Sequence, residues 1–300
     1  MDAIQKNMMR PTKSSKSFEQ LSKEILGDED IVAFIKEQGM TNDQVGLSIS
    51  KFFEYKTERD KLLKQDASYI AEGYKPVLIM NEGYADVVYR ETPELVEYRQ
   101  QEAIRNRIQL MNLPESLRHI SSTDLDFEDE FRFEVYQALE NFVQSYPNNS
   151  QGLYIFGRFG IGKSYLMAYL AQRLSKTHGL STILVHYPTF VVDIKNAIKD
   201  GSVKDKIDEL KMAQVLVLDD IGAEQHSPWV RDDVLQVILQ HRMQENLPTF
   251  FTSNFSFADL ERHFATGKSG DETWQAQRVM ERIRYLAREM YLEGKNRRHS

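Results

Sequence analysis

Apolar residues recur at every third or fourth position through the first part of the chain. Because side chains three and four residues apart share one face of a helix, this spacing predicts helices between residues 18 and 65. Gly27 and Gly39 mark the stops between them, and residues 41–43 form the cap region of the third. The recurring positions are Phe18, Leu21, Ile25, Ile31, Phe34, Ile35, Val45, Ile49, Phe52 and Phe53.

The period then changes to that of a strand. Residues 77–80 and 85–89 are short runs of strand-forming side chains, and they flank the turn-like sequence Asn81-Glu82-Gly83. This pattern predicts a β-hairpin. A polar helix over 93–110 is expected to follow as a connector, and Leu113-Pro114 marks entry into a second domain. The expected domains are therefore 1–110 and 111–300.

Helical and strand-like segments alternate beyond residue 113. Helices are expected at 131–146 and 164–178, with two short ones within 187–211. Apolar strand candidates lie at 152–156, 181–186, 215–218 and 249–253. Strands separated by helices indicate an α/β fold with a parallel sheet covered on both faces.

Composition narrows the class of protein. The chain has no cysteine, which excludes a disulfide framework and a thiolate zinc site. No apolar run approaches the length needed to span a bilayer. Residues 1–17 lack the apolar segment of a secretory signal, so we expect a cytoplasmic protein. The formal net charge of −7 means that any contact with nucleic acid must be local.

A glycine-rich stretch carries the strongest chemical signal. Residues 157–164 read G-R-F-G-I-G-K-S and fit the phosphate-binding loop, with a predicted strand before them and a predicted helix after them. In such a loop the glycines Gly157, Gly160 and Gly162 let backbone N–H groups face the phosphates. Lys163 reaches the β- and γ-phosphate oxygens, and the Ser164 hydroxyl ligates Mg²⁺. A chance match in a glycine turn is the alternative, which the flanking elements disfavour.

Two further polar features follow apolar strands. Asp219 and Asp220 come directly after residues 215–218, so Asp219 is expected to hold Mg²⁺ through water and Asp220 to polarise the attacking water. Asn254 ends the run 249–253, which would lie beside the strand that carries Asp219. Its amide could bond the attacking water or the γ-phosphate, although an ordinary turn at a strand end is equally open on spacing alone.

Together these motifs resemble those of the AAA+ ATPases, with Walker A, Walker B and sensor 1 elements in order. More specifically, the chain is similar to the DnaI family of primosomal helicase loaders from Gram-positive bacteria, which is related to DnaC. The similarity covers essentially the whole chain and is most specific in its C-terminal two-thirds. The segments that carry it are 218–224 (LDDIGAE), 229–232 (WVRD), 247–254 (LPTFFTSN), 280–284 (MERIR) and 292–298 (LEGKNRR).

The resemblance implies a fold and a function. The fold would be an AAA+ P-loop domain, with a parallel sheet between helices, preceded by a small, mainly helical N-terminal domain with a β-hairpin. The function would be ATP-dependent loading of the hexameric replicative helicase during primosome assembly and initiation of DNA replication. The N-terminal domain would bind the helicase, and the AAA+ domain would bind ATP, Mg²⁺ and single-stranded DNA and self-associate. Other primosome proteins are further expected partners, and no membrane is.

Arginines in the C-terminal part also gain roles from the resemblance. Arg282 matches the family's arginine finger, which would reach the γ-phosphate held by a neighbouring subunit, and Arg278 is its nearest rival. Arg297 is the candidate for sensor 2. A solvated helix face is the alternative for Arg278, Arg282 and Arg284.

Two departures from the family matter. Some members hold zinc through cysteines in the N-terminal domain, whereas this chain has none, so zinc is not expected. Packing around Phe52, Tyr55 and Tyr69 would hold that region instead, although aromatic residues here could also dock on the helicase. Many AAA+ enzymes place glutamate where this chain has Asp220, and the shorter side chain suggests slow hydrolysis.

Two segments are candidates for contact with DNA. In DnaC-like proteins the region matching 187–211 faces a central channel, and here it offers lysines for phosphates and Phe190 for base stacking. Its many acids make a solvated surface the alternative. The C-terminal basic cluster is the second candidate, with a disordered tail as its alternative. The basic residues concerned are Lys195, Lys199, Lys204, Lys206, Lys295, Arg297, Arg298 and His299.

Three other functions compete with the loader. A transposition-helper ATPase shares the same motifs and differs in its partner, a transposase; the N-terminal helices and hairpin favour the loader. An adaptor that binds ATP without significant hydrolysis is left open by Asp220. A small-molecule kinase is disfavoured, because Asn254 and the arginine-bearing C-terminal helix suit an oligomeric switch.

Overall fold

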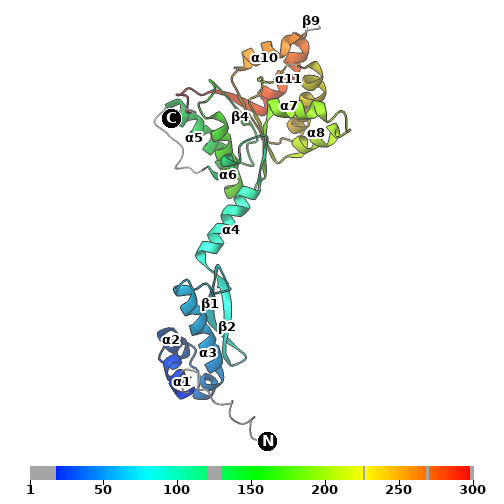
Figure 1. Ribbon diagram of the computed structural model, residues 1–300. Helices are drawn as coiled ribbons and strands as arrows, with labels where there is room; N and C mark the ends of the chain where they lie inside the picture. Colours follow the sequence, from blue (N-terminus) through cyan, green and yellow to red (C-terminus); the bar gives the residue numbers. More distant parts are fainter. Residues whose placement is uncertain (1–17, 121–129, 226, 268–269, 298–300) are drawn as a thin grey trace. The chain divides into compact units, whose positions relative to one another are not determined.

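The residues with helical spacing in the first part of the chain form three helices, and a β-hairpin follows them (Figure 1). The computed structural model describes residues 18–120, 130–225, 227–267 and 270–297. It divides into two units, Met1–Gln100 and Gln101–Ser300. The first unit contains α1 (Phe18–Leu26), α2 (Glu29–Glu37), α3 (Asn42–Leu63), β1 (Tyr74–Asn81) and β2 (Tyr84–Glu91).

Local signals fix where these elements begin and turn. Thr41 caps α3: its hydroxyl accepts a hydrogen bond from the Gln44 N–H, and the Gln44 side chain accepts one from the Thr41 N–H at 2.9 Å. Glu82 and Gly83 have φ of 49° and 92°, the positive values that a tight two-residue hairpin turn requires. The predicted helices and hairpin are confirmed.

A small apolar core joins the helices to the hairpin. Ile25, Ile31, Phe52 and Ala85 are its buried members. Buried Ser48 donates to the Gln44 carbonyl and accepts from the Ala85 N–H at 2.8 Å, which ties α3 to β2.

Of the aromatic residues expected to hold this unit, Phe52 is fully buried. The Tyr55 hydroxyl donates to Asp30 at 3.1 Å, and the Tyr69 hydroxyl donates to the Tyr74 carbonyl at 2.8 Å. All three therefore make contacts that stabilise the N-terminal unit.

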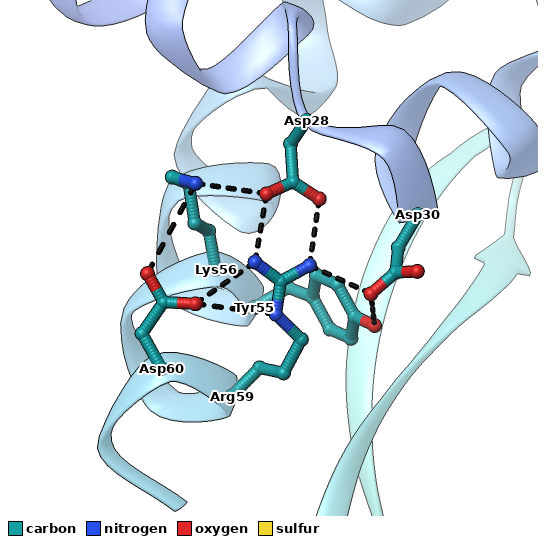
Figure 2. Close-up of polar contacts among 6 residues, drawn as sticks. All are labelled: Asp28, Asp30, Tyr55, Lys56, Arg59 and Asp60. Atoms are coloured by element: carbon teal, nitrogen blue, oxygen red, sulfur yellow. Dashed lines mark hydrogen bonds and ion pairs between the residues drawn. The ribbon is translucent and has the colours of Figure 1, made fainter. Parts of the chain in front are cut away.

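An ion-pair network fastens the start of α2 to α3 (Figure 2). The Arg59 guanidinium donates to both oxygens of Asp28 at 2.7 Å and also reaches Asp30 and Asp60. Lys56 makes a further bond to Asp28 at 2.8 Å. The hydrogen bond from Arg59 holds the pKa of the Asp28 carboxyl well below its usual range. Since Asp28 is nearly buried, this bidentate pair is worth more than a surface ion pair.

The second unit is built on a parallel sheet with the order β10-β4-β7-β6-β5-β3. Its strands are β3 (Ile108–Met111), β4 (Gly152–Phe156), β5 (Thr182–His186), β6 (Val215–Asp219), β7 (Thr249–Ser253) and β10 (Ala287–Tyr291). The short strands β8 (Thr266–Gly267) and β9 (Gly270–Asp271) pair separately. Helix α4 (Pro93–Asn106) spans the division between the two units. The other helices and helical turns of the second unit are η1 (Glu115–His119), α5 (Glu130–Ser145), α6 (Lys163–His178), α7 (Tyr187–Asn196), α8 (Val203–Met212), η3 (Val230–Leu235), α9 (Gln236–Gln244), α10 (Phe257–Ala265) and α11 (Thr273–Leu286).

The helix expected over 93–110 is too long. Helix α4 ends at Asn106, and Ile108–Met111 instead form an edge strand that pairs with β5. Burial of Ile108 and backbone pairing override the local helical pattern there. The division between the units also falls within α4, earlier in the chain than residue 110. Strand β10, on the other edge, carries no strong signal in the sequence.

Helices cover both faces of this sheet (Figure 1). Alternate residues of each strand enter different cores: Val215 and Val217 pack with α5 and α6, whereas Leu216 and Leu218 pack with α7, α9, α10 and α11. No helix among the described residues is long and apolar enough to cross a membrane.

A fully buried arginine ties together the loops that enter β6 and β7. The Arg242 guanidinium donates to the Ala213 and Pro248 carbonyls at 2.7 Å and to the Thr249 hydroxyl at 2.8 Å. It also reaches the Leu210 carbonyl at the end of α8. Its partners are uncharged, so burial lowers the pKa of Arg242. The arginine thereby satisfies carbonyls that would otherwise be orphaned at the end of α8.

The network around Arg59 yields a prediction for the N-terminal unit. Arg59→Ala leaves the nearly buried Asp28 carboxylate with Lys56 alone, and we expect it to destabilise this unit by roughly 2 kcal/mol at pH 7. Because the folded-state pKa of Asp28 is depressed, the network stabilises the fold above about pH 4 and is lost as the pH falls further. The cost of the substitution should therefore shrink in acid.

Hydrogen exchange of the α2 and α3 amides at pH 7, with thermal unfolding at pH 7 and pH 3, measures both effects. Lys51→Ala is the control, since Lys51 pairs with Glu54 and Asp86 at the surface, and little change is expected. Equal protection of wild type and Arg59→Ala would contradict a structural role for the network.

Candidate nucleotide site

The glycine-rich loop lies between the end of β4 and the start of α6. Gly160 and Gly162 have φ of 79° and 95°, a region that side-chain-bearing residues rarely adopt, and Gly162 is the N-cap of α6. The first N–H groups of the sixteen-residue helix α6 therefore point into the cleft in front of this loop. This is the arrangement that binds phosphate in P-loop proteins.

Lys163 is held across the cleft by the loop and by a neighbouring strand. The residue is buried, with only 7% of its surface exposed. The ammonium donates to the Gly157 carbonyl at 2.8 Å, the Arg158 carbonyl at 2.9 Å and the Asn254 side-chain oxygen at 2.8 Å. A cation is thus fixed where phosphate oxygens would approach.

Asp219 ends β6 beside Ser164. The Ser164 hydroxyl donates to one carboxylate oxygen at 3.0 Å, and the Thr252 hydroxyl donates to the other at 2.7 Å. Burial raises the pKa of Asp219, and these two hydrogen bonds oppose that rise. The paired hydroxyl and carboxylate are oxygen donors of the kind that Mg²⁺ takes, so these residues fit the metal expected from the sequence.

Asp220 and Asn254 meet at the same edge of the sheet. The Asn254 amide donates to the Asp220 carboxylate at 3.0 Å, while its oxygen accepts from Lys163. Asp220 has φ of 60°, and its N–H donates to the Thr252 hydroxyl at 2.9 Å. Asn254 therefore bridges the cation of the loop and the second acid of the strand.

The cleft has a volume of about 610 Å³ and extends beyond the phosphate loop. Leu113, Pro114 and Leu117 form its apolar end, which suits a base better than a phosphate. Leu113-Pro114 were expected only as the entry into the second domain, and other lining residues received no role from the sequence. They are Asn112, Leu117, Phe159, Tyr165, His186, Thr189 and Thr252.

The C-terminal segment runs along the outside of the phosphate loop. The Leu292 N–H donates to the Phe156 carbonyl at 2.8 Å, and the Arg297 N–H donates to the Gly160 carbonyl at 2.9 Å. A methyl group added at Gly160 would lie 2.3 Å from the Asn296 side chain. Arg297 also lines the cleft. Residues 292–297 are therefore part of the site, while Arg298 and His299 lie outside the described residues.

Other predicted residues lie elsewhere. Arg278 and Arg282 are on α11 and do not line the cleft. Arg282 donates to the Gln240 side chain at 2.8 Å and to the Arg278 carbonyl, and burial lowers its pKa. The expectation that Phe190 stacks on a base is wrong. Phe190 is 1% exposed and packs in the core, so its ring is not available to a base.

A buried glutamate lies just beyond the strand that carries Asp219. Glu224 is 8% exposed, and it accepts a hydrogen bond from the Gly222 N–H at 2.7 Å. Burial raises its pKa to about 7, and the charge on Asp220 adds to the rise. The acid therefore changes charge near neutral pH, close to the residues of the cleft.

Two family models match the chain. Residues 1–89 match the one described as the primosomal protein DnaI N-terminus, and residues 80–299 match the one described as IstB-like ATP binding protein. The chain therefore has an ATP-binding domain, and the cleft around Lys163 lies within it.

Individual proteins agree with these matches. The replicative helicase loader DnaI of Bacillus subtilis (strain 168) is 36% identical over 294 residues, which cover 95% of this chain and 94% of that protein. A crystal structure of a candidate primosome component from Streptococcus pyogenes serotype M3 is 55% identical, with a TM-score of 0.57, over 66% of this chain and 99% of that one. A crystal structure of DnaI is 42% identical, with a TM-score of 0.58, over 63% of this chain and 98% of that one.

The contact between Gly160 and Asn296 yields a prediction. Gly160→Ala adds a methyl group at a positive φ, which strains the loop, and it displaces the Asn296 side chain from the loop. We expect ATP affinity to fall at least tenfold, about 1.4 kcal/mol. Titration with a fluorescent ATP analogue measures it.

Gly179→Ala is the matched control for this prediction. Gly179 also has a positive φ, 68°, but lies at the other end of α6 with open space around its Cα. It should lose about 1 kcal/mol of stability and keep its ATP affinity. Equal affinity losses in the two variants would refute the role given to the loop contact.

Glu224 gives a prediction about pH. Its folded-state pKa lies above the ordinary 4.5, so its contribution to stability is complete below about pH 4.5 and declines as the pH rises through 7. Glu224→Gln keeps the hydrogen-bond acceptor without the charge. The free energy of unfolding of the variant should exceed that of wild type by about 3 kcal/mol at pH 8.5 and match it near pH 4.5.

Thermal unfolding across this pH range measures the difference. Glu245→Gln, at an exposed position after α9, is the control and should track wild type at every pH. A pH-independent difference between Glu224→Gln and wild type would count against titration of Glu224.

Proposed function

The chain belongs to the DnaI family of replicative helicase loaders, and from this premise we propose that it loads a hexameric replicative helicase onto DNA during primosome assembly. The observation that carries the proposal is the match of residues 1–89 to the DnaI N-terminus, joined in one chain to the ATP-binding domain. A cytoplasmic location and contact with other primosome proteins follow from that role.

In this proposal the N-terminal domain, with α4 as connector, binds the helicase. Its surface supports the assignment: Phe52 is buried in the core, but Leu47 and Phe53 on the same helix are 73% and 44% exposed, and Val32 on α2 is exposed too. Exposed apolar side chains of this kind suit a protein partner. The sequence left open whether the aromatic residues of this helix pack in the core or contact the helicase. Phe52 packs in the core, and Phe53 is proposed to contact the helicase.

The ATP-binding domain is proposed to hydrolyse ATP slowly. Bound ATP would supply the phosphoanhydride to be cleaved, and Mg²⁺ would neutralise its charge. Ser164 and Asp219 would hold the metal, and Lys163 would contact the phosphate oxygens. Asp220 would orient the water with Asn254, to which its short side chain is bonded. Because aspartate reaches less far than glutamate, a low rate is expected.

Three arginines are proposed to couple ATP binding to self-association. Arg282, or Arg278 beside it, would act as a finger on ATP held by a neighbouring subunit, since neither lines the cleft of its own chain. Arg297 would act as sensor 2 within the chain. ATP would therefore promote self-association through the AAA+ domain, and hydrolysis would release it. The same domain would also bind single-stranded DNA.

Two alternatives make different predictions about partners. A transposition helper would share the ATP-binding domain, but the DnaI-type N-terminus favours the loader. An ATP-binding adaptor without significant hydrolysis would use ATP only as a structural ligand, and Asp220 leaves this alternative open.

The experiment is light scattering of the full chain mixed with a replicative helicase, with and without ATP. Lys163→Ala should still form the complex but lose the ATP-dependent change, because it removes the cation that faces the phosphates and lies outside the N-terminal unit. Leu47→Asp should do the reverse: it should weaken the complex at least tenfold and leave ATP binding unchanged.

Lys211→Ala, a lysine outside the cleft, is the matched control and should behave as wild type. Full helicase loading by Lys163→Ala would support the adaptor. The absence of any complex under every nucleotide condition would favour the transposition helper.

A further inference from the structure

A second cleft, of about 450 Å³, lies on the ATP-binding domain and shares no lining residue with the nucleotide cleft. Its floor is the C-terminal half of α6. Its walls come from α5, from η1 and from the last residues of α4. The lining residues are Gln101, Ile104, Arg105, Arg118, His119, Ile120, Tyr136, Glu140, Tyr169, Gln172, Arg173 and Lys176.

Positive charge dominates this cleft. Four of its lining residues are Arg or Lys, and one carboxylate, Glu140, faces them. Glu140 is already engaged: Arg173 binds both of its oxygens at 2.8 Å, and the Tyr169 hydroxyl donates to it at 2.9 Å. Arg118 pairs with Glu115, which is largely in water. Two full positive charges remain, Arg105 and Lys176, for which the described residues provide no hydrogen-bond or ion-pair partner.

These cations are held by elements that are fastened to α6. The Ser175 hydroxyl donates to the Ile104 carbonyl at 3.0 Å, next to Arg105. The Gln172 amide donates to the Arg118 carbonyl at 3.0 Å. The charges of α4, η1 and α6 are therefore brought together by the fold, within a protein whose formal net charge is −7. A cluster of positive charge in a protein of negative net charge indicates an anionic ligand.

An aromatic wall narrows the class of anion. Tyr136 is half-buried and lines the cleft, and its ring lies 5.5 Å from that of the buried Tyr169. Cations for phosphates beside an aromatic surface for bases are the combination that binds single-stranded nucleic acid. An inorganic anion would use the cations but not the ring.

We propose that this cleft binds a short segment of single-stranded DNA, with Arg105 and Lys176 on its phosphates and Tyr136 against a base. The proposal rests on the proposed loader function and gives its DNA contact a location. The helices α7 and α8 suit that role less well, because Phe190 is buried and acids are interspersed among their lysines.

The test is fluorescence anisotropy of a labelled oligothymidine titrated with the full chain between 50 and 200 mM salt. The double variant Arg105→Gln/Lys176→Gln should bind at least tenfold more weakly at the lowest salt. Its slope of log affinity against log salt should fall by about 1.4, since each phosphate contact on a single strand contributes about 0.7.

Two matched variants separate this site from others. Lys199→Gln/Lys204→Gln neutralises two exposed lysines in the α7–α8 region and should leave affinity and slope unchanged. Tyr136→Leu should weaken binding without changing the slope, because it removes a base contact and no charge. Thermal unfolding and ATP titration of each variant check that fold and nucleotide cleft are intact.

Unchanged affinity and slope in Arg105→Gln/Lys176→Gln would overturn the proposal, as would a loss confined to Lys199→Gln/Lys204→Gln. If millimolar inorganic phosphate displaces oligonucleotides of every length equally well, the cleft is a site for free anions and not for DNA. Loss of the helicase complex with DNA binding intact would make it a protein-docking surface.

If wild type binds no oligonucleotide, the proposed DNA contact fails and this cleft assignment with it. The Lys163→Ala and Leu47→Asp experiments would be unaffected, so the loader function is judged separately.

Discussion

The order of strands in the parallel sheet is the constraint on which the nucleotide site depends. Strand β7 lies between β4 and β6. Asn254, which follows β7, therefore lies beside both the phosphate loop and Asp219. Thr252 then bonds the Asp219 carboxylate, and Asn254 joins Lys163 to Asp220. Carboxyl ends of parallel strands meet at one edge, which is where ligands bind in open α/β sheets. The two acids, the Asn254 amide and the phosphate loop meet only because this strand order brings them together.

Sequence reasoning succeeds where a pattern is local and strongly periodic. Strands β4 and β7 lie where their apolar runs predict them, and the phosphate loop stands between a strand and a helix as the motif requires. The capping box at Thr41 and the turn at Glu82-Gly83 are equally local. Such features are specified by neighbours in the chain, so a single sequence is enough to find them.

It fails where distant segments decide the outcome. The strand Ile108–Met111 exists because β5 offers a backbone edge, and the preceding helical pattern hides it. Phe190, spaced among lysines, looks like a surface aromatic but is buried by α7 packing on the sheet. Arg242 received no role from the sequence, because its partners are carbonyls in the loops that precede β6 and β7. The spacing of residue types along the chain does not predict these contacts, because they join segments that are distant in the sequence.

The segment 292–297 that runs along the phosphate loop has a consequence for the order in which the site is made. During synthesis the glycine loop leaves the ribosome long before Asn296 and Arg297 do. The Leu292 and Arg297 backbone bonds, and strand β10 beside β4, can form only after α11 has emerged. A nascent chain that ends before this segment would carry the whole phosphate motif without its outer support. The backbone support that residues 292–297 give the phosphate loop is therefore formed after the loop itself and after α11 have been made.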